Sequence, residues 1–358
     1  AMILLDSQKF YKKWLEDISD CQSIGNGHVQ HTAPFMGGGG GPAGWGGAIA
    51  VVPYEMYKIY GDKETFRRYL PKILRYFDYL DSRSSGGLVC REEEGVWCLG
   101  DWCPPEQITI CEPFVNTALY VKQMMMTKEA SEAIGESETA AMLEKRIEEK
   151  KQAILNAYYS PQTGSFIGDV QGANSFAVDI GLGGERAFNN TKKKYDAADA
   201  FDTGIFGTDI LTRVLFERGC ADTAFHLLTS TGKGSFYNMK KQGATTIWEN
   251  WDGERSHSHP MFGAVTRYLF SFILGITQEK NSAGYEKIVI APQIPDGLNR
   301  ASGHITTVRG EIAVSFVRTE REMDFYVTVS QKAWFTYGSD CEYELWEGEN
   351  HIHIDFEE

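Results

Sequence analysis

The first three quarters of the chain carry a hydrophobic stripe of helical period. Apolar residues recur every three or four positions, as in Phe10, Trp14, Leu15 and Ile18, and this spacing predicts amphipathic helices. Residues 184–196 are polar and basic, and they are expected to form a surface excursion instead. The predicted helices, which follow one another in pairs, cover residues 7–21, 43–60, 63–82, 112–132, 136–159, 174–182, 205–218, 220–230 and 260–275.

Beyond about residue 276 the hydrophobic period changes from helical to alternating. The alternating runs are short and end at prolines and glycines, which predicts strands of an antiparallel all-β module. We therefore divide the chain into a helical domain over residues 1–278 and a small β-sandwich over residues 279–358. The predicted strands cover residues 285–291, 301–309, 311–318, 323–330, 343–346 and 351–356.

Helix pairs in succession are typical of an α/α toroid, in which the joints at one end converge on a central pocket. The periodicity does not prove that the ring closes, and an open solenoid of stacked helix pairs is the alternative. One joint, residues 84–109, is a long aperiodic loop that contains Trp97, and its prolines exclude a helix. Loops of this length tend to be functional. The run Gly37–Gly41 is another loop, and no phosphate-binding motif follows it.

The overall composition narrows the range of partners. The chain has 358 residues, 42% hydrophobic and 13% aromatic, with a formal net charge of −14. This negative charge argues against nucleic acid and anionic membranes, which both need a basic face. No apolar run is long enough to span a bilayer. The location of the protein is poorly constrained, with the cytoplasm slightly favoured.

The cysteines and histidines indicate neither disulfides nor a metal. Seven cysteines are spread over a large chain without paired spacing, so we expect them to be free and reduced. The pair His257 and His259 has no other histidine or cysteine near it in sequence, which makes it weak evidence for a metal. We predict no cofactor and no metal site.

The strongest candidate chemistry lies in the stretch Gly243–Asp252. Glu249 stands between the indoles of Trp248 and Trp251, and His259 follows ten residues after the glutamate. Sugar rings stack their C–H faces on aromatic rings and bind carboxylates and imidazoles through their hydroxyls, and a carboxylate in such a pocket can act as a general base. A buried tryptophan pair with a capping acid is the structural alternative.

Six short stretches, in this order, resemble a known family. They are residues 10–17, Gly44–Ala48 with the helix up to Pro53, Gly100–Trp102, Thr203–Thr208, Gly243–Glu249 and His259–Gly263. Together they resemble the C-terminal part of the family 78 glycoside hydrolases, the α-L-rhamnosidases, and residues 285–295 resemble the start of that family's C-terminal sandwich. The resemblance covers nearly the whole chain. It implies an (α/α)6 barrel and an inverting hydrolysis of terminal α-L-rhamnose.

The resemblance also implies roles for individual residues. Glu249 matches the general base that activates water, and Trp45, Asp101, Trp102 and His259 match positions around the rhamnose. Together with Trp248 and Trp251 these residues form the predicted substrate site. Each has an alternative interpretation: Trp45 as core, Asp101 and Trp102 as a structural loop, and His259 as a helix cap.

Two departures from the family pattern affect the expected activity. The family's general acid is a glutamate in an Asp-Cys-Pro motif just upstream of the helix at residues 7–21, and these 358 residues do not contain that motif. We therefore expect a fragment of low activity, with Glu106 or Glu112 as weak candidates for a substitute acid. The family also usually has Asp where this chain has Gly47.

Three functions and one mode of assembly follow as hypotheses. The first is an α-L-rhamnosidase acting on rhamnose-containing oligosaccharides or glycosides. The second is a non-catalytic carbohydrate-binding protein, and the third is another α/α-toroid enzyme such as a glucoamylase-like hydrolase. We expect the toroid to be incomplete at its N-terminal seam. Apolar surface from Leu4, Leu5 and Phe10 would then be exposed there, where a second copy of the chain could cover it.

Overall fold

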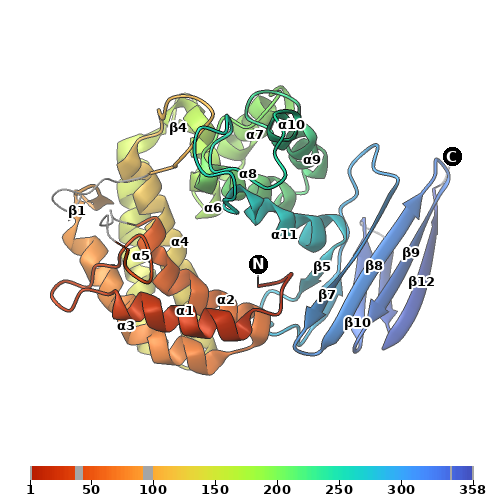
Figure 1. Ribbon diagram of the computed structural model, residues 1–358, viewed down its shortest axis with the longest axis horizontal. Coiled ribbons are helices and arrows are strands. Elements are labelled where there is room, and N and C mark those ends of the chain that lie inside the picture. Colours follow the sequence, from red (N-terminus) through yellow and green to blue (C-terminus); the bar gives the residue numbers. More distant parts are fainter. Residues whose placement is uncertain (1, 37–42, 92–99, 339–340, 357–358) are drawn as a thin grey trace.

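The computed structural model describes residues 2–36, 43–91, 100–338 and 341–356, and it contains a large helical domain beside a β-sandwich (Figure 1). The glycine run at 37–41, Trp97 and Cys98 lie outside the described residues. None of the helices in the described ranges is both long and apolar enough to cross a membrane. The six cysteines within these ranges are free, as predicted.

The helical domain begins with α1. It also contains two small β-hairpins, β1-β2 and β3-β4, whose strands have two residues each. Its elements are α1 (Gln8–Asp20), η1 (Trp45–Gly47), α2 (Ala48–Tyr60), α3 (Lys63–Ser82), β1 (Ser84–Ser85), β2 (Leu88–Val89), α4 (Glu112–Ala133), α5 (Ser137–Tyr158), β3 (Tyr159–Ser160), β4 (Ser165–Phe166), η2 (Ile167–Gly172), α6 (Ala173–Asp179), α7 (Gly184–Asp196), α8 (Ile205–Glu217), α9 (Ala221–Thr229), α10 (Phe236–Lys241), η3 (Phe262–Val265), α11 (Thr266–Tyr268) and η4 (Leu269–Ile273).

The hairpin of α2 and α3 illustrates how the sequence sets these elements. Gly61 ends α2 in the left-handed region, at φ 70°, where a residue without Cβ is favoured. Asp62 then caps α3 because its carboxylate accepts the Thr65 backbone N–H at 2.9 Å. The apolar face of α3, which includes the fully buried Phe66 and Phe77, packs against α2 and α4.

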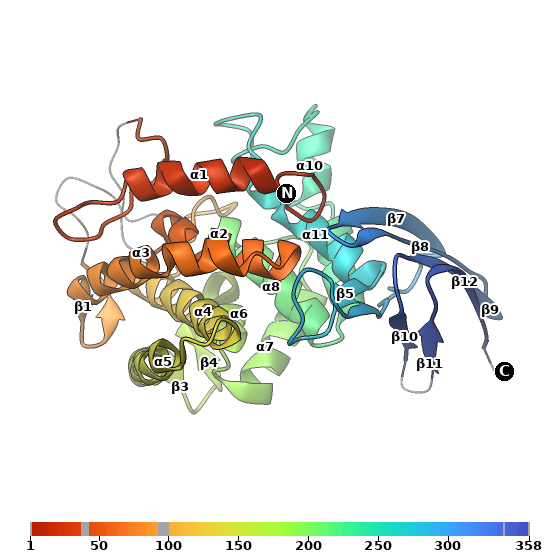
Figure 2. The same ribbon diagram turned by 90° about the horizontal axis from the view of Figure 1, so that it is seen from below.

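The helices form the predicted toroid. Helices α2, α4, α6 and α8 and the turn η3 pack against one another in that order, and α3, α5, α7 and α9 each pack on the preceding helix (Figures 1 and 2). Arg267 of α11 and Glu55 of α2 form an ion pair at 3.6 Å, and both residues line a cavity of about 650 Å³. The predicted mainly α toroid, rather than the open solenoid, is therefore confirmed.

Two local predictions for the helical domain were wrong. Residues 184–196 form α7 rather than a surface excursion, because Ala187, Phe188 and Tyr195 bury a narrow apolar stripe beneath the basic residues. The long helix expected at 260–275 is divided into a 3₁₀ turn, one short α segment and a π turn. The segment is apolar throughout, so its sequence pattern does not distinguish an α-helix from 3₁₀ or π turns.

The β-sandwich consists of two four-stranded sheets, with strand orders β11-β10-β6-β5 and β12-β9-β8-β7. The pairing is antiparallel except between β10 and β6, which run parallel, unlike the all-antiparallel expectation. The strands are β5 (Ile276–Gln278), β6 (Ile288–Ile290), β7 (Arg300–Thr307), β8 (Gly310–Arg318), β9 (Glu322–Val329), β10 (Ala333–Tyr337), β11 (Cys341–Leu345) and β12 (Gly348–Asp355).

The two domains are joined by a hydrogen-bonded connection. The sheet begins at β5, before the predicted boundary at residue 278, and the division into independently folding units stays a prediction. Lys58 at the end of α2 donates through Nζ to the carbonyls of Lys280 and Ser282, at 2.9 Å each. The Lys58 carbonyl in turn accepts the Gly284 N–H at 2.8 Å and the Gln278 amide at 2.9 Å.

The N-terminal segment exposes apolar side chains beside α1. Leu5 and Phe10 are each 63% exposed, and Leu4 is partly buried against the core. The apolar surface expected at the N-terminal seam is therefore present for Leu5 and Phe10 but not for Leu4. Whether a second chain covers it stays a prediction.

Candidate active site

Glu249 lies in a loop that is held closed by backbone hydrogen bonds. Its own N–H donates to the Ser256 carbonyl at 2.8 Å, and the His259 N–H donates to the Ile247 carbonyl at 2.8 Å. These two bonds fix the start and the end of the loop that precedes η3. They bring Glu249 and His259 together, although ten residues separate them.

The Glu249 carboxylate is oriented by three neighbours. Trp102 donates its indole N–H to Oε1 at 3.4 Å, and the Ser256 N–H donates to Oε2 at 3.3 Å. His259 Nδ1 lies 3.7 Å from Oε2, and the glutamate side chain is 17% exposed. The contacts are long, so the carboxylate is positioned while its oxygens keep acceptor capacity for a water molecule. This is the arrangement that a general base requires.

Trp102 connects this loop to the start of α8. Its carbonyl accepts the Ile205 N–H at 2.8 Å, and the Arg255 guanidinium lies over its indole ring, 5.0 Å from the centroid. A cation over an indole face stabilises both groups. Trp102 therefore lies between a fixed backbone and a charged side chain of the Glu249 loop, and it is partly exposed.

Asp101 is fully buried, and its carboxylate accepts hydrogen bonds from the backbone at the N-terminus of α8. Its Oδ2 accepts the Gly204 N–H at 2.8 Å and its Oδ1 accepts the Gly207 N–H at 2.9 Å. Burial raises the pKa of this carboxyl group to about 7, although the backbone donors of Gly207 and Gly204 act in the opposite direction. At 0% exposure it cannot touch a sugar in this conformation. It satisfies helix N–H groups that would otherwise lack partners.

The two tryptophans that flank Glu249 are largely buried. Trp251, 2% exposed, packs on Phe201 and Phe262 and directs its indole N–H to the Thr203 carbonyl at 3.4 Å. Trp248, 6% exposed, stacks on the ring of His257 at 4.5 Å. Both indoles therefore support the loop from beneath, as the structural alternative proposed for them.

Trp45 lies at the other side of the α8 N-terminus. Its ring packs on Phe206 in the first turn of α8 at 4.6 Å, and both residues line the cavity between α2 and α11. Gly47 ends the same 3₁₀ turn, η1, and is buried, and a Cβ there would overlap the Gln123 amide nitrogen. Gln123 thus occupies the space into which a side chain at position 47 would extend.

Glu106, one of the two candidates for a substitute acid, lacks the environment that the role requires. The Glu106 side chain is 73% exposed and forms an ion pair with Lys233 at 2.7 Å. A general acid acts from inside the site, whereas this side chain lies in solvent and is already paired with a lysine. Glu112 begins α4 and packs beside Gly100.

The structure thus brings Glu249, Trp102 and His259 into one group, with Trp45 on the neighbouring side of the α8 N-terminus. Sequence reasoning missed Arg255 and Phe206. Arg255 has no periodic or motif signal, and its role appears only when the loop closes over Trp102. Phe206 lies inside the quoted stretch Thr203–Thr208, but nothing in that stretch predicted its contact with Trp45.

Comparison with known proteins identifies both domains. Residues 1–273 match the family described as the bacterial alpha-L-rhamnosidase 6 hairpin glycosidase domain, and residues 275–332 match the bacterial alpha-L-rhamnosidase C-terminal domain. An alpha-L-rhamnosidase of Alteromonas sp. is 26% identical over 360 residues, and one of Streptomyces avermitilis is 28% identical over 330 residues. These matches cover 92% and 87% of this chain, but only 38% and 30% of the relatives.

Solved structures show the same fold. The crystal structure of the Streptomyces avermitilis alpha-L-rhamnosidase complexed with L-rhamnose superposes with a TM-score of 0.85 at 24% identity, covering 98% of this chain and 36% of that one. The alpha-L-rhamnosidase of Aspergillus terreus gives a TM-score of 0.86 at 20% identity, covering 99% and 44%. The chain therefore spans about a third of the length of the curated relatives that it matches.

Proposed function

Because the chain belongs to the bacterial α-L-rhamnosidase six-hairpin glycosidase family, we propose that it serves in the hydrolysis of terminal α-L-rhamnose from glycosides. The observation that carries this proposal is the Glu249 carboxylate, held by the Trp102 indole and the Ser256 N–H beside His259. In an inverting hydrolysis a carboxylate in this position removes a proton from water as the water attacks the anomeric carbon. The substrate is a rhamnose-containing oligosaccharide or glycoside.

The surrounding residues take different roles in this proposal. Trp102 and His259 lie against the base, so they contact the sugar and orient the water. Trp45 offers an aromatic surface that packs against a C–H face of a sugar ring. Asp101, Trp248 and Trp251 do not contact the sugar in this proposal. They hold the α8 N-terminus and the Glu249 loop in place, and these segments carry the residues that do.

The leaving group requires a second carboxyl group. Inverting glycosidases place the acid and the base about 6.5–9.5 Å apart, with water on one face of the sugar. The Asp-Cys-Pro motif of the family does not occur in these 358 residues, and Glu106 is an exposed ion-paired residue. We therefore expect the chain by itself to hydrolyse natural rhamnosides about 10²–10⁴-fold more slowly than an enzyme with both groups.

A comparison of two substrates tests this function. p-Nitrophenol is a good leaving group that needs little protonation, so p-nitrophenyl α-L-rhamnoside should be cleaved slowly while a rhamnose-containing disaccharide remains intact. Glu249→Gln should abolish the residual p-nitrophenol release, because an amide cannot accept the proton of water. The matched control is Glu254→Gln, an exposed glutamate of the same loop, which should keep the wild-type rate. Equal rates for the wild type and Glu249→Gln would disprove the assignment of the base.

The second candidate function is non-catalytic carbohydrate binding. The exposed Glu106 favours it, since an aromatic pocket with a carboxylate but without an acid binds a sugar without cleaving it. Calorimetric titration with L-rhamnose, combined with complete inactivity on the aryl rhamnoside, would support this function over hydrolysis. The same binding with measurable aryl-rhamnoside cleavage would support the hydrolase.

A further inference from the structure

A cluster of ionisable side chains lies on the outer face of the β-sandwich, far in sequence from the Glu249 loop. It is formed by the edge strand β12 and its neighbour β9, which are antiparallel with His353 opposite Asp324 and Asp355 opposite Glu322. Side chains two residues apart in a strand point to the same face. The register therefore brings two residues of each strand together on one exposed surface.

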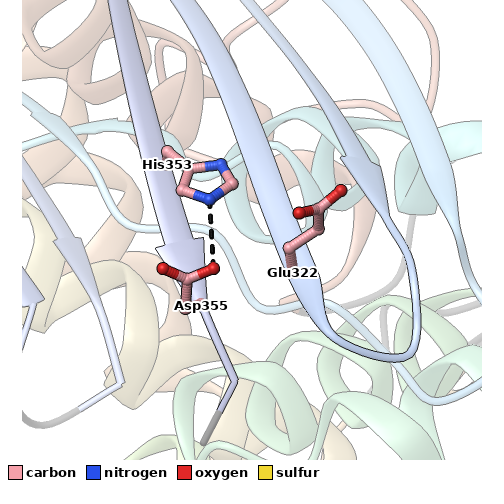
Figure 3. A group of neighbouring side chains, drawn as sticks. All are labelled: Glu322, His353 and Asp355. Atoms are coloured by element: carbon pink, nitrogen blue, oxygen red, sulfur yellow. Dashed lines mark hydrogen bonds and ion pairs between the residues drawn. The ribbon is translucent and has the colours of Figure 1, made fainter.

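Three of these residues could hold a metal ion. One ligand atom each of Glu322, His353 and Asp355 lies within 4.8 Å of the others, and the three side chains converge between the two strands (Figure 3). His353 Nε2 and Asp355 Oδ1 are already 3.2 Å apart. Ligand atoms around a tetrahedral Zn²⁺ are separated by roughly 3.4 Å, which follows from bonds of about 2.0–2.2 Å. Binding therefore requires the Glu322 carboxylate to move from at most 4.8 Å to about 3.4 Å from the other ligand atoms.

The histidine is held as metal-binding histidines usually are. His353 Nδ1 contacts Asp324 Oδ1 at 2.9 Å, while Nε2 faces Asp355. Metal-binding imidazoles almost always donate their second ring N–H to a carboxylate, which fixes the ring orientation. Asp324 is in turn held by His351 Nε2 at 2.7 Å. The carboxylate that orients the ring is therefore itself held by a second imidazole, which contacts the same oxygen, Oδ1.

We propose that Glu322, His353 and Asp355 form a Zn²⁺ site that links β12 to β9, with Asp324 orienting His353. One imidazole nitrogen and two carboxylates suit Zn²⁺, whereas Ca²⁺ and Mg²⁺ prefer oxygen ligands alone. The cluster is exposed, with 43% exposure for the His353 side chain and 81% for Asp355, so an ion reaches it from solvent. Sequence reasoning missed the site because its ligands come from two strands, and only their register brings them together.

Calorimetric titration of the tag-free 358-residue chain with ZnCl₂ at pH 7.5 tests the proposal. The wild type should bind one ion, and His353→Ala should reduce the affinity at least about 100-fold because it removes the nitrogen ligand. Asp324→Asn should reduce it about 10–100-fold, the usual effect of changing a group that orients a ligand. The matched control is His304→Ala, an exposed histidine of β7 on the same sheet, which should bind Zn²⁺ like the wild type.

A second measurement locates the ion independently of these variants. Anomalous scattering at the zinc edge from crystals grown with ZnCl₂ should place the ion between His353 Nε2 and Asp355. Zn²⁺ should also raise the melting temperature of the wild type but not of His353→Ala, because an ion that binds the folded state stabilises it. Absence of binding, binding unchanged in His353→Ala, or an ion bound to His351 instead would each overturn the proposal.

Discussion

Replacing Asp101 with alanine tests whether this residue positions the backbone or binds the sugar. The substitution removes the acceptor of two buried N–H groups, those of Gly204 and Gly207, which bond to its carboxylate at 2.8 and 2.9 Å. A buried donor that loses its partner costs about 1–3 kcal/mol. We therefore expect Asp101→Ala to lower the free energy of unfolding by about 2–6 kcal/mol. The measurement is urea unfolding followed by circular dichroism.

The contribution of Asp101 to the free energy of unfolding should also depend on pH, in a direction that follows from its pKa. The folded-state pKa of Asp101 is raised to about 7, above the ordinary value of 3.8, so the folded protein binds this proton more tightly than the unfolded chain does. The contribution of Asp101 to stability is therefore largest below about pH 4 and falls by about 1.4 kcal/mol per pH unit as the pH rises toward 7. The difference in unfolding free energy between the wild type and Asp101→Asn should decrease accordingly.

The control for both measurements is Asp252→Asn, which changes an exposed aspartate near the Glu249 loop and should leave the stability nearly unaltered. The reasoning is refuted if Asp101→Ala costs less than about 1 kcal/mol. A stable Asp101→Ala protein that no longer binds L-rhamnose would show that the aspartate contacts the sugar after a rearrangement of its loop.

Three further predictions concern the core and the surface. Gly47→Ala should destabilise the protein because its Cβ overlaps the Gln123 amide, and Gln123→Ala in the same chain should restore much of the melting temperature. Asp179→Ala should cost about 3–5 kcal/mol in urea unfolding, since it removes the buried carboxylate that pairs with Arg213 and Lys122 at 2.7 Å each and leaves Arg213 only the more exposed Glu217 at 3.3 Å. If a second copy covers the N-terminal seam, the mass from light scattering should fall from dimer toward monomer in Phe10→Ser, and a monomeric wild type would contradict the predicted homo-oligomer.

The helical domain could be predicted because its signal is periodic. Helices such as α3 and α5 bury one stripe each, so the toroid followed from such stripes and from the family stretches. The prediction failed where burial was narrow or uniform. In α7 the buried Phe188 and Tyr195 lie among lysines and asparagines. The high polarity of the segment therefore predicted a surface excursion instead of a packed helix. Strand β10 was missed although its alternate residues are buried, and its parallel pairing with β6 comes from topology that no local pattern contains.

The site could be predicted only in part, for a different reason. A motif identifies residues that lie near a pocket, but it does not distinguish those that face it from those that support it. Glu249, Trp102 and His259 share one group, whereas Asp101 points into the backbone of α8 and Trp251 into the core. That distinction depends on side-chain direction, which is fixed by packing between segments far apart in the chain.

The hydrogen bonds of Lys58 make the connection between the domains a mechanical coupling. Lys58 ends the helix that begins one turn after Trp45, and it holds the segment that leads into the sandwich through the Lys280 and Ser282 carbonyls and the Gly284 N–H. A force or a bound partner that displaces the sandwich therefore pulls on α2 through these hydrogen bonds. Trp45 lies just before the other end of α2, and Gln278 and Tyr285 of the segment that leads into the sandwich line the same cavity. A displacement of the β-domain therefore reaches this cavity along α2 and also directly through the residues that line it.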